Sequence, residues 1–209
     1  MNSVLRLSIL ILIPIFMVSC GTSPNQADIR TAIQESRTKK DDYFSTATNS
    51  PIPENKRNDF DGLNYFPIDL NYRITTNIVE YSDKDTVVMP TTKDREQYYL
   101  RWGNFDFTID GNTDTLQVYK PLQISADHEP YFFIPFYDET NNQMTYGGGR
   151  YLDIPVQASG KYVIDFNQAY NPYCAYDYER WSCPMPPMEN RVDFPVDAGE
   201  KLLYKDEHH

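Results

Sequence analysis

Two short segments of the chain concentrate residue types that bind ligands. In the first, Gly147, Gly148 and Gly149 precede Arg150. Consecutive glycines permit backbone conformations closed to other residues, or a close approach by a ligand. An arginine beside free backbone N–H groups can hold a carboxylate or phosphate in bidentate fashion. The segment could therefore form an anion site, or a β-bulge or tight turn in which Arg150 pairs with an acidic neighbour.

The second segment reads DFNQAYN. Asp165 and Asn167 alternate with Phe166 in a predicted strand, so both side chains should project to one face. Together the two segments could form a polar pocket with aromatic walls, which suits a sugar or a small anionic ligand. The candidate ligand-binding residues are Tyr146, Gly147, Gly148, Gly149, Arg150, Tyr151, Asp165, Asn167, Tyr170 and Asn171. The alternative is a buried network in which Asp165 pairs with Arg150 and the asparagines satisfy loop backbone. Both interpretations predict that the two segments pack together.

The sequence supports catalysis less well than it supports ligand binding. Asp153 and Asp165 could act as the acid and base of a hydrolase. No histidine lies near a candidate nucleophile and no GxSxG motif occurs, which argues against Ser-His or Cys-His hydrolysis. The GGGR segment lacks the Lys-Ser/Thr ending of a phosphate-binding loop. We therefore assign no catalytic residue and expect no cofactor.

Cys174 and Cys183 lie nine positions apart in a segment crowded with prolines. In an exported protein such a pair predicts a disulfide, which should contribute roughly 2–3 kcal/mol for a loop of this size. A metal site would need further ligands, and His128 is the only histidine outside the tail pair His208 and His209. The spacing matches no zinc pattern, so we expect no metal, although a Cys-dependent redox or metal enzyme stays the third functional alternative.

The elements that must position these residues are mostly strands. Residues 25–44 predict one amphipathic helix, because Ile29, Ile33 and Phe44 follow a helical period. Residues 45–64 contain prolines and Gly62 and predict a loop. Apolar and polar residues alternate on both sides of Asp110-Gly111-Asn112, which predicts a hairpin. Further predicted strands are Ile74–Tyr81, Thr86–Met89, Tyr98–Trp102, Tyr131–Tyr137 and Tyr162–Phe166.

No βαβ alternation occurs, so the sheet should be antiparallel. The expected fold is mainly β, an antiparallel β-sandwich or partly open barrel with one N-terminal amphipathic helix. A long Pro-rich loop region, which includes Pro172, Pro184, Pro186 and Pro187, should form the C-terminal part. About 190 residues after a cleaved signal suffice for a single domain.

The first residues resemble an export signal. Arg6 and the free amine form a weakly basic start, Leu7 to Val18 is almost unbroken apolar sequence, and Ser19 precedes Cys20. The apolar run is shorter than the roughly twenty residues that a spanning helix needs. Met17-Val18-Ser19-Cys20 resembles the lipobox of bacterial lipoproteins, with Met in place of the more usual Leu. The alternative is an uncleaved N-terminal anchor in which Cys20 is an ordinary thiol.

The lipobox resemblance implies that Cys20 carries acyl chains, which anchor the protein in its partner, a lipid bilayer. Gly21 follows the cysteine, and in well-studied lipoproteins a residue other than Asp there favours the outer membrane. No acidic run follows, which favours the periplasmic face. The expected organisation is a signal peptide at 1–19, a tether at 20–26, one globular domain at 27–204 and a disordered tail at 205–209.

The charge balance restricts the partners. The net charge is −11, from 30 acidic and 19 basic residues, and no segment clusters Lys and Arg. Nucleic-acid binding depends on a basic surface, so we expect none.

Four segments of the chain resemble the ordered signature blocks of one family, the bacterial and archaeal family called domain of unknown function 1684. The segments are SPIPENKRNDFDGLNYFPID, YGGGRYLD, DFNQAYNPYCAY, and CPMPPMENR through to AGEK. The resemblance runs from about Ser50 to Lys201 and implies that the blocks belong to one domain. It implies no known activity. We therefore expect a membrane-anchored envelope lipoprotein that is a non-catalytic ligand-binding or structural domain, with the carboxylate hydrolase as the alternative.

Overall fold

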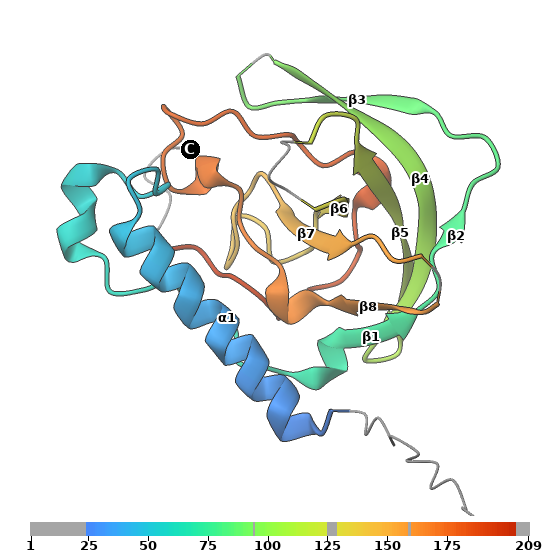
Figure 1. Cartoon of the computed structure of the whole chain (residues 1–209), viewed down its shortest axis with the longest axis horizontal. Helices are drawn as coiled ribbons and strands as arrows, with labels where there is room; N and C mark the ends of the chain where they lie inside the picture. The colour runs from blue at the N-terminus through green and yellow to red at the C-terminus, as the bar shows by residue number, and fades with distance from the viewer. Residues whose placement is uncertain (1–23, 94, 125–128, 159, 204–209) are drawn as a thin grey trace, which may run out of the picture.

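The computed structural model describes residues 24–93, 95–124, 129–158 and 160–203, which form a mainly β structure with one long helix (Figure 1). Every pairing between its named strands is antiparallel, as predicted. The strands are β1 (Arg73–Thr76), β2 (Val79–Glu80), β3 (Thr86–Pro90), β4 (Glu96–Ile109), β5 (Asn112–Pro121), β6 (Tyr131–Phe136), β7 (Arg150–Pro155) and β8 (Tyr162–Asp165). The predicted signal segment, including Cys20, lies outside the described residues, as do His128 and the tail.

Within the described part of the chain, the larger sheet has six strands in the order β2-β4-β5-β6-β7, with β3 also paired to β4. Its centre is the β4–β5 hairpin, whose turn residues Asp110 and Gly111 have φ values of 50° and 84°. Positive φ at both turn residues matches the right-handed twist of the flanking strands, which explains the Asp-Gly sequence. This confirms the predicted hairpin.

Among the described residues, the second sheet consists of β1 and β8, and the two sheets share one core. Figure 1 shows the larger sheet curving around the interior, with β1 and β8 along one side. Phe105 and Phe107 from β4, Phe136 from β6 and Ile164 from β8 meet there, each almost completely buried. The arrangement is mainly β, with two antiparallel sheets around one core, as the sequence predicts.

Helix α1 (Gln26–Thr46) runs along the outside of the β structure (Figure 1). It begins at Asn25, whose side chain accepts a hydrogen bond from the Asp28 N–H at 2.9 Å and so satisfies one of the free donors of the first turn. Ile33 and Phe44 are buried, as their helical spacing predicts, whereas Ile29 stays partly exposed. No helix in the described part of the chain is long and apolar enough to cross a membrane.

The predicted strands differ from the structure in three places. The predicted strand Ile74–Tyr81 is two strands, β1 and β2, which belong to different sheets. The separate strands predicted on either side of Gly103 are the single strand β4, with a register shift between Arg101 and Gly103. A Cβ on Gly103 would lie 2.1 Å from the Val79 carbonyl oxygen, so only glycine permits this close approach of β2. Strand β7 has no clear alternation and was not predicted.

After β8 the described chain contains only short 3-10 helices, namely η3 (Phe166–Gln168), η4 (Tyr173–Ala175) and η5 (Met188–Asn190). Two further 3-10 helices, η1 (Glu54–Asp59) and η2 (Leu70–Tyr72), precede the sheets. The predicted disulfide joins Cys174 to Cys183, with their Cα atoms 6.1 Å apart. The Thr92 hydroxyl accepts a hydrogen bond from the Cys183 N–H at 3.1 Å, which fixes this loop to the turn between β3 and β4.

Candidate functional site

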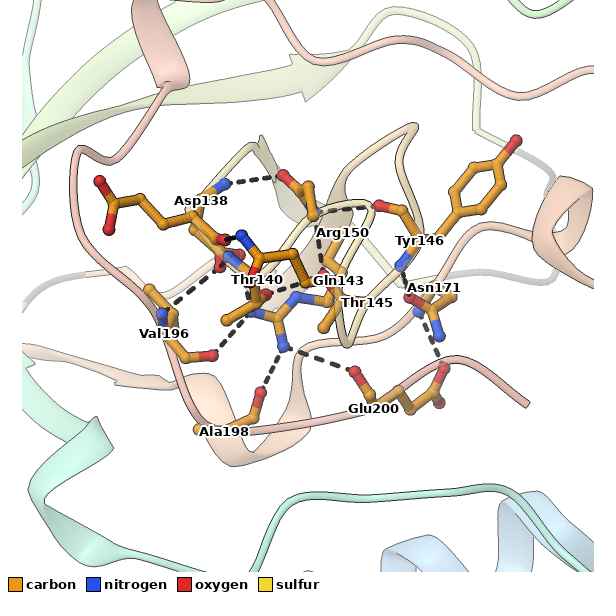
Figure 2. Close-up of polar contacts among 12 residues, drawn as sticks. Asp138, Thr140, Gln143, Thr145, Tyr146, Arg150, Asn171, Val196, Ala198 and Glu200 are labelled. Atoms are coloured by element: carbon orange, nitrogen blue, oxygen red, sulfur yellow. Dashed lines mark hydrogen bonds and ion pairs between the residues drawn. The ribbon is translucent and has the colours of Figure 1, made fainter. Parts of the chain in front are cut away.

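Arg150, at the start of β7, lies at the centre of a buried polar network (Figure 2). Its side chain is 0% exposed, and one terminal nitrogen donates to the Asp138 carboxylate at 2.7 Å and to the Val196 carbonyl at 2.8 Å. The other terminal nitrogen donates to the Ala198 carbonyl. A guanidinium so enclosed is not accessible to a ligand from solvent. Of the two alternatives for Arg150, the structure therefore supports the buried network.

Asp138 extends the network into the loop between β6 and β7. One carboxylate oxygen accepts the Thr140 N–H at 2.7 Å and the Val196 N–H at 3.4 Å, while the other faces Arg150. The Thr140 hydroxyl forms a further bond with the Thr145 hydroxyl at 2.8 Å. Figure 2 shows these groups converging on the guanidinium from the loop and from the C-terminal segment. The network therefore joins two segments far apart in sequence.

The glycine triplet is explained by packing. A Cβ on Gly147 would lie 1.9 Å from the Asn142 side-chain oxygen, and one on Gly148 would lie 2.3 Å from the Tyr146 ring. Gly149 has a φ of 84° and lies against the Phe136 carbonyl. Neighbouring atoms thus occupy the space that a ligand would need for a close approach. The sequence correctly indicated that these positions require glycine. The requirement comes from packing within the protein and not from a ligand.

The partner predicted for Arg150 was wrong. Asp165 forms its ion pair with Arg73, at 2.7 Å, because β8 pairs with β1 and places the two residues opposite each other. Strand β8 ends at Asp165, so Asn167 lies in η3 rather than farther along the strand. The Asn167 amide nitrogen nevertheless donates to Asp165 at 2.9 Å and to the Asp69 carbonyl at 2.8 Å. Both side chains are buried and satisfied by the protein itself.

The two predicted segments do pack together. Tyr151 and Tyr170 exchange two backbone hydrogen bonds, of 2.9 and 3.0 Å, and their rings meet edge to face. Asn171 accepts the Tyr146 N–H at 3.4 Å. However, Asn171 is 1% exposed and Tyr151 is 5% exposed, so the contact forms a closed interface and not the polar pocket of the ligand-binding interpretation.

Glu200 is a buried charged residue that the sequence reasoning missed. Its carboxylate accepts the Asn171 N–H at 2.8 Å and the Tyr176 hydroxyl at 2.7 Å, and it pairs with Lys40 of α1. Burial, and then the Glu200 charge, raises the pKa of Tyr176 well above its ordinary value. The only signal in the sequence was the position of Glu200 in the final family block. Its contacts link α1, the DFNQAYN segment and the C-terminal segment.

An open groove lies next to this network, between α1, β7 and β8, with a volume of about 510 Å³. Its lining residues are mostly aliphatic, with four charged side chains among them. They are Pro24, Asp28, Ile29, Ala32, Ile33, Arg73, Leu152, Asp153, Ile154, Pro155, Val163, Asp165 and Gln168. The groove thus contains Asp165 from the predicted ligand set, but Arg150 and the glycines are not part of it.

Helix spacing and strand pairing explain how the groove is positioned. Asp28 and Ala32 lie one turn apart on α1, and so do Ile29 and Ile33, so these residues form one stripe that faces the strands. Opposite them, Asp153 accepts a hydrogen bond from the Tyr170 hydroxyl at 2.7 Å. Within the described residues, no group of three or more His, Cys, Asp or Glu side chains could hold a metal ion.

The comparisons with known proteins concern the whole domain. A family model described as a protein of unknown function (DUF1684) matches residues 58–201. The solution NMR structure of an uncharacterized protein from Haloarcula marismortui is 36% identical, covers 87% of this chain and 97% of its own length, and superimposes with a TM-score of 0.66. A comparison with curated proteins finds no match. The chain therefore belongs to the DUF1684 family, as its sequence blocks predicted.

Proposed function

We propose that the protein is a non-catalytic ligand-binding lipoprotein of the bacterial envelope, and that its ligand binds in the groove between α1, β7 and β8. One observation carries this proposal: the groove combines an aliphatic wall with charged groups at fixed positions. Small-molecule sites in proteins share this combination of a mainly apolar cleft and a few oriented polar groups. The buried Arg150 network fixes the start of β7, because this strand begins at Arg150, and the same strand lines the groove from Leu152 to Pro155.

The polar groups of the groove are held in place by the protein. The Arg73–Asp165 pair is fixed by the register of β1 and β8, and Asp165 also accepts two hydrogen bonds from Asn167, one from its backbone and one from its side chain. Asp153 is oriented by the Tyr170 hydroxyl. Groups held in this way lose little conformational freedom when a ligand binds, which favours affinity.

The proposed lipid anchor would place the groove near a membrane. Cys20 precedes the groove residue Pro24 by four positions, and four residues span at most about 14 Å. With acyl chains on Cys20, the ligand site would open close to the bilayer surface. We propose the outer membrane and its periplasmic face, on the basis of Gly21 and the absence of a following acidic run. A ligand with an apolar part would be available there.

A carboxylate hydrolase is the second candidate, because Asp153 and Asp165 line the same groove. Acid–base catalysis requires a carboxyl group that can exchange protons with a substrate. The Asp165 carboxylate instead already has partners within the protein, namely Arg73 and two hydrogen bonds from Asn167. Because the Asp165 carboxylate is already occupied in this way, we place ligand binding ahead of hydrolysis.

Hydrogen–deuterium exchange of the full-length protein, with and without a small-molecule and lipid extract of the producing cells, tests the proposed site. We expect slower exchange in peptides covering residues 24–33, 152–155 and 163–168. Ala32→Trp should prevent the change because the indole would occupy the groove. Ala27→Trp, on an exposed position of α1 outside the groove lining, is the matched control and should behave as wild type. Protection centred on residues 146–151 instead would contradict the proposal.

A further inference from the structure

We propose that two copies of the chain associate through the free edge of β3, which pairs antiparallel with β3 of the second copy about a two-fold axis at Val87. This inference goes beyond ligand binding and does not depend on the groove. Figure 1 shows β3 at one margin of the larger sheet, on the side away from α1. Among the described strands, β3 pairs only with β4, so its other side is an edge of the sheet.

The hydrogen bonds at the two ends of β3 show which of its backbone groups point outward. The Arg101 N–H donates to the Asp85 carbonyl at 2.8 Å. The Thr91 N–H donates to the Arg95 carbonyl at 2.9 Å, in the same register. The odd-numbered residues therefore bond to β4, and the residues between them direct their N–H and C=O groups to the opposite side. The outward-directed residues are Thr86, Val88 and Pro90.

The outward groups of Pro90 are already used, but those of Thr86 and Val88 are available. Pro90 has no N–H, and its carbonyl accepts the Met185 N–H at 2.8 Å, so the C-terminal segment covers this end of the edge. No hydrogen bond from the described part of the chain reaches the N–H or C=O of Thr86 or Val88, and both residues are exposed. Neither is charged and neither is proline, so this stretch lacks the features by which natural sheet edges prevent strand addition.

A two-fold axis at Val87 satisfies these backbone groups. It places Thr86 of each copy opposite Val88 of the other, and the residues of such a pair exchange both N–H···O bonds. The same surface then serves both copies, as a two-fold interface requires. An axis at Val88 would oppose Thr86 to Pro90, which has no donor and whose carbonyl is already bonded. An axis at Thr86 would oppose Val88 to Lys84, which lies before the strand begins.

The charges beyond the two ends of β3 are complementary in this arrangement. Residues 82–85, before the strand, carry two acidic side chains and one basic one. Residues 91–95, after the strand, carry two basic side chains and one acidic one. An antiparallel pair brings the first segment of one copy towards the second segment of the other, so that opposite net charges approach at both ends. Such complementarity favours the antiparallel orientation over a parallel one.

The pairing would also cover apolar surface. Val88 is 45% exposed and lies opposite Tyr98, which is 50% exposed. The other face of the same two strands is closed, because Met89 and Tyr99 belong to a buried cluster. In the proposed pair the Val88 side chains of the two copies are diagonal neighbours on the exposed face, within reach of each other. Their contact would remove apolar surface from water and so favour association.

Disulfide crosslinking of the full-length protein in the cells that make it tests the inference. At the axis the two copies of residue 87 form a non-hydrogen-bonded pair with Cα atoms about 4.5 Å apart, a separation that a disulfide can join. After mild oxidation, we expect Val87→Cys to give a covalent dimer on a non-reducing gel. Val79→Cys is the matched control, because Val79 is 60% exposed but lies on β2, outside the proposed contact. It should give no more dimer than wild type, which measures crosslinking through the native cysteines.

A backbone variant provides a second measurement. Val88→Pro removes one outward N–H from each copy and leaves the bonds to β4 intact, whereas Val88→Thr keeps this N–H and is the control. Sedimentation velocity of the full-length protein in detergent, at a series of concentrations, should show a dimer. Val88→Pro should weaken it about tenfold or more, because both copies lose a hydrogen bond, and Val88→Thr should change it little. Circular dichroism checks that each variant is folded.

Three results would overturn the inference. The first is an equal yield of dimer from Val87→Cys and Val79→Cys. The second is a folded Val88→Pro protein that dimerises as tightly as wild type. The third is a covalent product of Val87→Cys that contains a different protein, which would show that the edge binds another chain and not a second copy. None of these results would change the evidence for the ligand groove, so the two proposals fail independently.

Discussion

The Arg150 guanidinium donates to the Asp138 carboxylate at 2.7 Å, and both side chains are completely excluded from solvent. This pair joins the first residue of β7 to the loop that precedes it, and the Val196 and Ala198 carbonyls attach the C-terminal segment to the same guanidinium. The YGGGRYLD block is therefore a structural centre of the domain. Its importance for the fold is separate from the ligand binding that we propose for the groove between α1, β7 and β8.

Arg150→Ala should lower the free energy of unfolding by about 3–5 kcal/mol, because Asp138 would be left buried without its partner. Urea unfolding followed by circular dichroism measures this change. Arg101→Ala is the control, since Arg101 and its partner Glu189 are each about one-third exposed, at 33% and 36%. Breaking that pair should cost about 1 kcal/mol or less. A similarly small loss for Arg150→Ala would show that the network does not support the fold.

Gly149→Ala and Gly111→Ala form a second matched pair, because both glycines have a φ of 84° but only Gly149 is enclosed. A Cβ at position 149 would lie 2.7 Å from the Phe136 carbonyl oxygen, whereas one at position 111 would have no atom within 4 Å. The backbone conformation should cost each variant about 1–2 kcal/mol. Overpacking should add about 1–3 kcal/mol at Gly149 alone. Equal losses at the two positions would contradict the packing explanation of the glycine triplet.

Alkaline pH should destabilise the fold through its buried tyrosines. Burial raises the pKa of Tyr151, Tyr170 and Tyr176 well above the ordinary value. Below about pH 10 a tyrosine is protonated in both folded and unfolded chains, so its contribution is constant. Above that pH the unfolded chain releases the proton while the folded chain keeps it, and stability falls with rising pH.

We therefore expect the free energy of unfolding, measured by guanidinium titration at a series of pH values, to fall steadily above about pH 10. Tyr176→Phe should be less stable at neutral pH, because the Glu200 carboxylate loses a donor, and its decline above pH 10 should be shallower. Tyr178→Phe, at a 48% exposed tyrosine, is the control for loss of a hydroxyl. If the free energy of unfolding falls as steeply with pH in Tyr176→Phe as in wild type, ionisation of Tyr176 does not cause the loss of stability.

Lipidation at Cys20 is tested separately from the domain. Cys20→Ser should leave the precursor unprocessed at this position and without acyl chains, because serine has no thiol to form the thioether. Metabolic labelling with a palmitate analogue, followed by gel analysis, measures the result. Equal labelling of wild type and Cys20→Ser would refute the assignment of this residue.

The sequence predicted those parts of the fold that depend on local patterns. Alternation around Asp110-Gly111 placed the central hairpin, and the period of Ile33 and Phe44 placed α1 within two residues at each end. The division of Ile74–Tyr81 into β1 and β2 could not be predicted, because it depends on which distant strand each half contacts. Strand β7 was missed because its two faces are both partly covered, which removes a simple alternation.

The candidate site was predicted less well, for a related physical reason. Charged side chains such as those of Arg150 and Asp165 can either bind a ligand or form a buried ion pair. Only the fold decides which of these two roles they have. The sequence correctly predicted that the two segments meet, since Tyr151 and Tyr170 pair through their backbones. It could not show that Asp138 would be the partner of Arg150, or that α1 and β7 would line the same groove. Both relationships join residues from different elements.

Native mass spectrometry of the protein purified from the cells that normally make it tests the central claim most directly. If the groove binds a ligand, wild type should carry a small-molecule adduct that Ala32→Trp lacks and that Ala27→Trp retains. The mass of the adduct would also identify its chemical class. Wild type without an adduct, or the same adduct on Ala32→Trp, would contradict a ligand site between α1, β7 and β8.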